Sequence, residues 1–336
     1  MIDVNSEPIV RTVLGDIHPF DLGVLDYHEH LFQASPLLKG EELADENLSA
    51  QEAQLLHSHG VGAMVEATPI GLGRNVEAVA RISASTGLVV VHTTGAHHSG
   101  HYRAHDPFLE LTVSELAELF VAEIVDGFLA ENQLPVSGPL GSPVRAGLVK
   151  AGIRYWAMNS FEKRALDACG LAALQTGCAV MVHLDWGSAA HEVLDIFESH
   201  GLPPNRVVLA HMDRNLDSGL HADLASRGAY LGYDGMARHR GAPDSAILDC
   251  LSAAVEKGAG RRIVLGGDVA RASRYISYGG MPGLAYLPRR FLPRLAERVS
   301  EETYRALTRA NGARLLSMPA RSPHLSAENA SQVSQE

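Results

Sequence analysis

The chain has few cysteines and no long apolar segment. Its three cysteines, Cys169, Cys178 and Cys250, form no CxxC pair, and each lies in an apolar stretch. We therefore expect buried, reduced thiols rather than disulfides or zinc ligands. No uninterrupted apolar run reaches about 18 residues, and the first residues lack the cationic start and apolar region of a signal peptide. These absences predict a cytoplasmic protein.

Positive charge is also scarce. The formal net charge is -11 and no long run of lysine or arginine occurs, which argues against nucleic acid or an anionic membrane as a partner. With 46% hydrophobic and 20% charged residues, the composition is that of an ordinary globular protein. No linker rich in proline or glycine divides the chain. We therefore expect one domain over residues 1–318 and a disordered tail, rich in Ser, Ala and Gln, over residues 319–336.

Eight short apolar segments alternate with helical stretches, after a short strand or hairpin within residues 1–21. The predicted strands are 22–30, 61–69, 88–96, 145–152, 179–185, 206–213, 229–235 and 262–268. The predicted helices are 49–59, 75–85, 112–130, 160–176, 188–200, 217–227, 243–257, 289–298 and 301–316. Continuous apolar strands between helices indicate parallel strands that are buried on both faces.

Eight such units are what a closed (β/α)8 TIM barrel requires. The alternative is an open, doubly wound sheet, which predicts a glycine-rich phosphate loop at one strand end. No strand is followed by GxGxxG, and the segment GLGRN after the second strand comes nearest but lacks the third glycine. We therefore predict the barrel.

Polar side chains gather where the predicted strands end. They are His28, His30, Lys150, His183, His211 and Asp268. Each has an ordinary alternative, since a lysine can extend to solvent, a core histidine can be hydrogen-bonded and an aspartate can cap a helix. The carboxyl ends of barrel strands converge on one cavity, so we expect all six to form one site.

The chemistry of these six side chains indicates two bound cations. The chain has 17 histidines, and imidazole and carboxylate groups are the usual ligands of Zn²⁺, which we expect here, with Mn, Co or Fe as alternatives. A buried lysine near cations loses its proton, and its neutral amine can react with CO2 to give a carbamate that bridges two metals. Such a pair can share a nucleophilic hydroxide, whose proton Asp268 would accept.

These features together resemble the phosphotriesterase family of the amidohydrolase superfamily, over about residues 10–318. The family pattern is HxH on strand one, a carboxylated lysine on strand four, histidines on strands five and six, and an aspartate on strand eight. Further similar segments are TVLGDI, TPIGLGRN, VVLAHMD and NGARLL. The resemblance implies that His28, His30 and Asp268 hold the more buried metal, that His183 and His211 hold the more exposed one, and that Lys150 bridges them. It also implies a homodimer.

Two positions depart from the family pattern. The phosphotriesterase and acyl-homoserine-lactone branches place histidine or arginine after the GxD of strand seven, where this chain has Gly235. Some lactonase members have a tyrosine in the loop after strand three that contacts the metal-bound water, and the nearest residue here is His97. Neither branch's substrate can therefore be transferred directly.

The loops on the expected catalytic face are rich in histidine and arginine. We expect the substrate to contact His97, His98, Arg238, Arg271, Arg274 and Tyr275. Arginines gathered near a metal site in an acidic protein favour an anionic substrate, because guanidinium groups bind carboxylate or phosphate in a forked geometry. The alternative is that these arginines are solvated or pair with local acids such as Asp234 and Asp244.

The leading prediction is a binuclear metal hydrolase that opens a polar or anionic lactone, such as a sugar lactone, or cleaves a carboxylic ester. Weak phosphotriester hydrolysis is compatible with it. Three alternatives stay open, namely a phosphotriesterase or acyl-homoserine lactonase, an amidohydrolase that acts on an amide, and a noncatalytic binding barrel.

Overall fold

All eight predicted strands are present and form one parallel sheet. The computed structural model describes residues 7–130 and 133–320. The strands are β3 (Leu25–Glu29), β4 (Ala63–Glu66), β5 (Val89–Gly95), β6 (Ala146–Ile153), β7 (Ala179–Leu184), β8 (Val207–Ala210), β9 (Tyr230–Tyr233) and β10 (Ile263–Leu265). Neighbours in the sheet are also neighbours in the chain, from β3 to β10, whereas a doubly wound sheet would reverse its order part-way.

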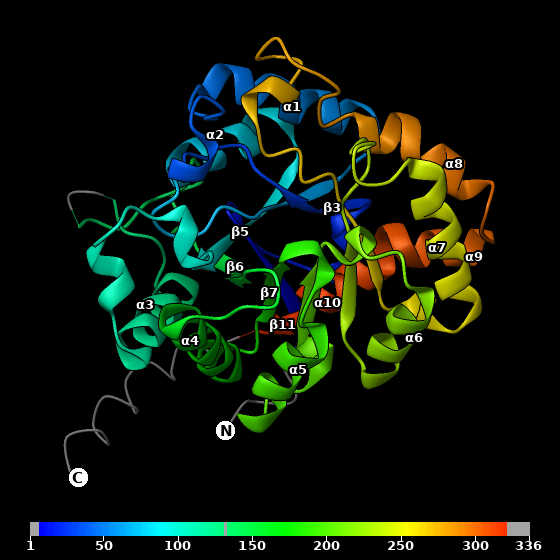
Figure 1. Ribbon diagram of the computed structural model, residues 1–336. Coiled ribbons are helices and arrows are strands. Elements are labelled where there is room, and N and C mark those ends of the chain that lie inside the picture. Colours follow the sequence, from blue (N-terminus) through cyan, green and yellow to red (C-terminus); the bar gives the residue numbers. More distant parts are fainter. Residues whose placement is uncertain (1–6, 131–132, 321–336) are drawn as a thin grey trace.

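The sheet nearly closes on itself, because β10 and the residues after it lie beside β3. The backbone N–H of Asp268 donates to the carbonyl oxygen of His28 at 2.9 Å, and the N–H of Gly267 donates to the carboxylate of Asp26 at 3.2 Å. Helices surround the strands on the outside (Figure 1). The predicted (β/α)8 barrel is therefore confirmed, and the open-sheet alternative is wrong.

The strands are buried on both faces, which explains their continuous apolar sequences. In β7, Ala179 and Met181 belong to the apolar cluster inside the barrel, whereas Val180 and Val182 belong to the cluster between strands and helices. Successive strand residues face opposite sides, so His183 continues the inward face of Ala179 and Met181. The same alternation places Lys150 of β6 inward, two residues after Leu148.

The helices follow the predicted order, with some differences in their ends. They are α1 (Glu46–Ser58), α2 (Val76–Thr86), α3 (Val113–Val125), α4 (Ser160–Thr176), α5 (Ala190–Ser199), α6 (Ser218–Arg227), α7 (Asp244–Glu256), α8 (Leu292–Ala296), α9 (Glu301–Arg305) and α10 (Asn311–Leu316). Helix α3 begins at a capping box of Thr112 and Glu115. It ends five residues before the predicted end, because Gly127 has a φ of +114° and Phe128 then bonds to Val144.

The two ends of the described chain meet on a small sheet. The predicted N-terminal hairpin is β1 (Pro8–Thr12) with β2 (Gly15–Ile17), and Pro319 of β11 (Met318–Pro319) pairs with Pro8. Most of the predicted tail, residues 321–336, lies outside the described residues. All three cysteines are free and buried, as expected. Within residues 7–130 and 133–320, no helix has the length and apolarity to cross a membrane.

Candidate metal centre

The six predicted ligands lie around one cavity at the carboxyl ends of the strands. Two belong to β3 and its exit, two to β6 and β7, and two to the segments that follow β8 and β10. The cavity has a volume of about 430 Å³, and His28, His30, Lys150, His183, His211 and Asp268 all line it. Glu29 instead accepts a hydrogen bond from the N–H of Val269 at 2.9 Å, so it points away from its neighbouring histidines.

The Lys150 side chain points at the other predicted ligands. Its Nζ lies 3.2 Å from Nε2 of His28 and donates to the carbonyl oxygen of Ala67 at 2.9 Å. Oδ1 of Asp268 lies 3.8 Å from Nε2 of both His28 and His30. Nε2 of His211 and Nδ1 of His183 are 2.7 Å apart. The six side chains, spread over 241 positions of sequence from His28 to Asp268, thus converge on one point.

A buried carboxylate that the sequence analysis did not place in the site orients two of these histidines. Asp234, just after β9, accepts hydrogen bonds from Nδ1 of His211 at 2.6 Å and from Nδ1 of His28 at 3.1 Å. Thr68 similarly contacts Nδ1 of His30 at 2.6 Å. In each ring Nε2 is left toward the cavity, which is the arrangement that metal-binding histidines have. The donor set and its orientation therefore fit a divalent ion.

Burial keeps the basic side chains of the centre short of protons. It lowers the pKa of Lys150 to about 8, although Asp268, Asp234 and Glu66 favour the charged amine. Burial, followed by the charge of Arg214, lowers the pKa of His211 to about 4. Burial and Lys150 hold the pKa of His30 well below its usual value. Neutral imidazoles and a lysine that is readily deprotonated are the forms that ligation and carboxylation need.

The two oxygens of Asp268 have different surroundings. Oδ2 accepts hydrogen bonds from Arg214 at 2.9 Å and from Arg238 at 2.5 Å, whereas Oδ1 is the oxygen that faces His28 and His30. Burial alone would raise the pKa of Asp268, but Arg238, His28 and His211 hold it below its usual value. Asp268 is therefore an ionised carboxylate with one oxygen left for a cation.

Similarity to known proteins agrees with this geometry. The sequence model of the phosphotriesterase family matches residues 8–316. The chain belongs to the phosphotriesterase family. This is a family of metal-dependent hydrolases, and the chain is therefore a hydrolase. Its histidine and aspartate clusters could bind metal.

Three known proteins resemble the chain over most of their length. A phospho-furanose lactonase of Mycoplasmopsis synoviae (strain 53) is 29% identical over 307 residues, which is 85% of this chain and 85% of that protein. An N-acetyltaurine hydrolase of Danio rerio is 27% identical over 334 residues, which is 86% of this chain and 92% of that protein. The crystal structure of a lactonase from Listeria monocytogenes has a TM-score of 0.84 and 28% identity, and the match covers 93% of this chain and 100% of that one.

Five of the six predicted substrate contacts line one of two neighbouring cavities, and the sixth lines neither. His97, His98, Arg238 and Arg271 line the cavity of the metal centre, and Arg274 lines a neighbouring cavity. Tyr275 lines neither of these cavities. It is fully buried, and its hydroxyl donates to the carbonyl oxygen of His30. This placement argues against a direct substrate contact for Tyr275, which instead supports the strand end that carries the two β3 histidines.

The glycine that departs from the phosphotriesterase family pattern has a structural reason. The N–H of Gly235 donates to Oδ2 of Asp213 at 2.7 Å, and a Cβ at this position would lie only 3.0 Å from that oxygen. A side chain at position 235 would therefore be crowded by Asp213, and in this chain Arg214 and Arg238 contact Asp268. Arg214 directly follows the sixth-strand segment VVLAHMD, but the sequence alone did not indicate this role.

Proposed function

We propose that this chain is a binuclear metal hydrolase that opens a lactone, or cleaves a carboxylic ester, whose substrate carries an anionic or strongly polar group. The observation that carries this proposal is the arginine-lined space beside the metal centre. The named lactonase relatives support the bond type. The one-domain organisation, a dimeric state and a cytoplasmic location stay predictions from the sequence.

The metal ligands are proposed as the resemblance implies. His28, His30 and Asp268 would hold one ion, His183 and His211 the other, and Lys150 would bridge them as a carbamate. When bound, two such ions, with Zn²⁺ as the expected metal, activate water and polarise the carbonyl oxygen of a substrate. Asp268 would accept the proton of the attacking water on its carboxylate.

Arginines connect the metal centre to a second cavity of about 740 Å³. Arg214, Arg238 and Arg271 line both cavities, and Arg240 and Arg274 line only the second. Among the described residues, Nε of Arg214, Nε of Arg238 and Nη2 of Arg274 are buried without a hydrogen-bond partner. Guanidinium groups bind carboxylate and phosphate, so the arginines that line this second cavity favour an anionic group there. The scissile carbonyl would then lie in the first cavity.

An amide-cleaving enzyme is the second candidate, because one relative is named N-acetyltaurine hydrolase. The same polarised carbonyl serves amide hydrolysis, and the arginines would bind an acidic amide equally well. Only substrate comparison separates the two functions.

A substrate panel on the metal-loaded enzyme tests the proposal. It contains ribono-1,4-lactone with and without a 5-phosphate, acyl-homoserine lactones, paraoxon and N-acetyltaurine. We expect the phosphorylated lactone to have the highest kcat/KM. Weak hydrolysis of paraoxon would not contradict the proposal. The proposal fails if acyl-homoserine lactones or paraoxon react far faster than every sugar lactone. A fastest reaction with N-acetyltaurine would instead favour the amide function.

Replacing Lys150 tests the proposed bridge. Lys150→Ala should lose metal and activity together, as measured by metal analysis and turnover of the best panel substrate. Lys163→Ala, at an exposed position of α4, is the matched control and should retain both. A Lys150→Ala variant with two metals and full turnover would show that Lys150 is only structural. Wild-type protein without metal after expression in supplemented medium would favour a noncatalytic binding barrel.

A further inference from the structure

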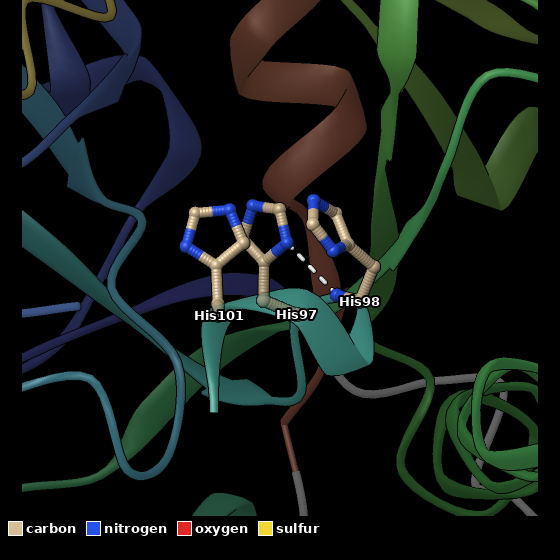
Figure 2. Close-up of side chains that lie close together, drawn as sticks. All are labelled: His97, His98 and His101. Carbon is tan, nitrogen blue, oxygen red and sulfur yellow. Dashed lines mark hydrogen bonds between the residues drawn. The ribbon is translucent and has the colours of Figure 1, made fainter. Parts of the chain in front are cut away.

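Three histidines gather on the loop after β5, at the wall of the metal-centre cavity. His97, His98 and His101 lie around the short 3-10 turn Ser99–His101, and their rings lie close together (Figure 2). The ring centroid of His97 lies 3.8 Å from that of His101 and 4.6 Å from that of His98. One nitrogen of each ring lies within 4.8 Å of the others, so the cluster resembles a third metal site.

One hydrogen bond argues against that interpretation. The backbone N–H of His98 donates to Nδ1 of His97 at 2.8 Å, which is the dashed line in Figure 2. A nitrogen that accepts a hydrogen bond carries no proton, so the ring proton of His97 must lie on Nε2. If Nε2 bound a metal, the proton would move to Nδ1 and would face the N–H of His98. His97 is therefore a fixed hydrogen-bond donor and a poor ligand.

The surroundings of His97 hold this geometry in place. The backbone N–H of His97 donates to the hydroxyl oxygen of Tyr102 at 3.0 Å, and that hydroxyl donates to the carbonyl oxygen of Ile70 at 3.0 Å. On the other side, the ring packs against Gly152 of β6. A Cβ at position 152 would lie 3.0 Å from both Nδ1 of His97 and the backbone N of His98. The bare glycine therefore leaves room for the hydrogen bond that fixes the tautomer.

The protein offers no acceptor for the proton on the other ring nitrogen. Within residues 7–130 and 133–320, no hydrogen bond joins Nε2 of His97 to another group, although the side chain is buried. The nearby His183, whose ring centroid lies 4.4 Å away, has both nitrogens engaged, with His211 and with Asp185. A donor that is fixed at a cavity wall without a partner suits a ligand oxygen.

We propose that His97 is a catalytic residue that donates its Nε2–H to an oxygen of the bound substrate, either the carbonyl oxygen or the leaving oxygen. The donor role rests on the hydrolase function proposed above. The tautomer of His97 does not, because it follows from the hydrogen bond between His98 N–H and Nδ1 of His97. The ligand class is an oxygen acceptor, and the cluster is not a third cation site. Preorganised donors of this kind stabilise the charge that develops on oxygen during acyl transfer.

Nitrogen NMR of the metal-loaded enzyme tests the tautomer without any substrate. In protein labelled with ¹⁵N-histidine, the His97 signals are those that disappear in His97→Gln. We expect the chemical shifts and long-range couplings of a neutral ring that is protonated at Nε2. A ring protonated at Nδ1, or at both nitrogens, would overturn the proposal whatever the substrate is. A third equivalent of bound Co²⁺ that His97→Gln loses would also overturn it.

Kinetics with ribono-1,4-lactone 5-phosphate tests the donor role. His97→Phe keeps an aromatic ring without a donor and should lower kcat/KM about 100-fold with unchanged metal content. His97→Gln can accept from the His98 N–H and donate from its amide, so it should recover most of that loss. A His97→Phe enzyme that is as active as the wild type would overturn the donor role. Absence of turnover in the wild type would count against the substrate proposal alone, because the NMR result still decides the tautomer.

Discussion

Asp234 is a single buried carboxylate that sets the direction of two imidazoles. Asp234→Asn would replace one acceptor oxygen by an NH2 group, which cannot accept from an Nδ1–H, so either His28 or His211 would lose its orienting partner. We expect metal affinity to fall by about 10-fold to 100-fold, since partners of ligating histidines have effects of this size. Competition with a chelator measures the affinity, and excess metal should restore part of the activity.

Asp244 provides the matched control for this substitution. It is also a buried carboxylate, but its partners are the hydroxyl of Tyr286 at 2.6 Å, the N–H of Ala237 at 3.0 Å and the Arg294 side chain at 3.4 Å, outside the histidine cluster. Asp244→Asn should reduce stability and leave metal affinity unchanged. Equal losses of metal affinity in both variants would show that the effect of Asp234 is general destabilisation.

The burial of His92 should make the stability of the fold depend on pH. It is fully buried, its Nε2 has no partner among the described residues, and burial followed by Arg74 lowers its pKa to about 3. The unfolded chain therefore binds this proton between about pH 6.5 and 3, so stability falls as pH falls through that window. At pH 5 the loss is roughly 2 kcal/mol. His92→Asn should reduce the change in urea stability between pH 7 and pH 5 by that amount, whereas exposed His59→Asn should not.

The sequence predicted the six converging side chains because strand ends have a fixed place in a barrel. The partners of those side chains were not predictable in the same way. The contacts of Asp234 with His28 and His211, and of Arg214 with Asp268, join positions far apart in sequence, and no period or spacing indicates them. The direction of Tyr275 was equally open, since a tyrosine in a loop can face the cavity or the core.

The pair of strands β5 and β6 needs a glycine beside the proposed bridging lysine. Gly95 pairs with Lys150 and has a φ of +104°, and a Cβ there would overlap the carbonyl oxygen of Lys150 and lie 2.6 Å from its amide nitrogen. Backbone atoms in a barrel strand cannot move aside. Gly95→Ala should therefore destabilise the protein by more than the roughly 1–2 kcal/mol that positive φ alone costs an alanine, and should lower metal content. Urea unfolding and metal analysis measure the two effects.

Gly60 separates backbone strain from the clash. Its φ of +95° is similar, but nothing lies within 4 Å of the Cβ that it would gain. Gly60→Ala should show only the strain and should keep its metal. If both variants lose the same stability and keep the same metal content, the close approach of β5 to Lys150 does not affect metal binding.

Strands were easier to predict than helix ends. Each strand is an apolar run that is buried on both faces, so its sequence marks it without knowledge of its neighbours. The start of α3 lies next to the predicted Thr112, which forms a capping box, but its end depends on the pairing of Phe128 with Val144, which is a tertiary contact. The predicted helix at 289–298 is a π-helical turn, Leu287–Phe291, followed by α8.

At the scale of the whole molecule, the proposed metal centre lies across the seam where the barrel closes. His28 and His30 come from β3, whereas Asp268 follows β10, and the backbone bond from Asp268 to His28 is one of few direct links between these two elements within the described chain. An ion held by His28, His30 and Asp268 would therefore strengthen the contact between the two sides, which few hydrogen bonds join directly.

Removal of the metals should loosen that seam before it loosens the rest of the barrel. Ligand binding to the folded state adds about 2.7 kcal/mol at a concentration 100 times Kd, which corresponds to a Tm about 5 °C lower after chelation. Hydrogen exchange should rise first in β3 and β10, and should change least in β5, which carries no proposed ligand and pairs with β4 on one side and β6 on the other. The double variant His28→Ala/His211→Ala, with one proposed ligand of each ion removed, should show no Tm change with chelator. If the wild-type Tm and exchange rates are the same with and without chelator, the cations contribute nothing to closure, and β10 meets β3 through protein contacts alone.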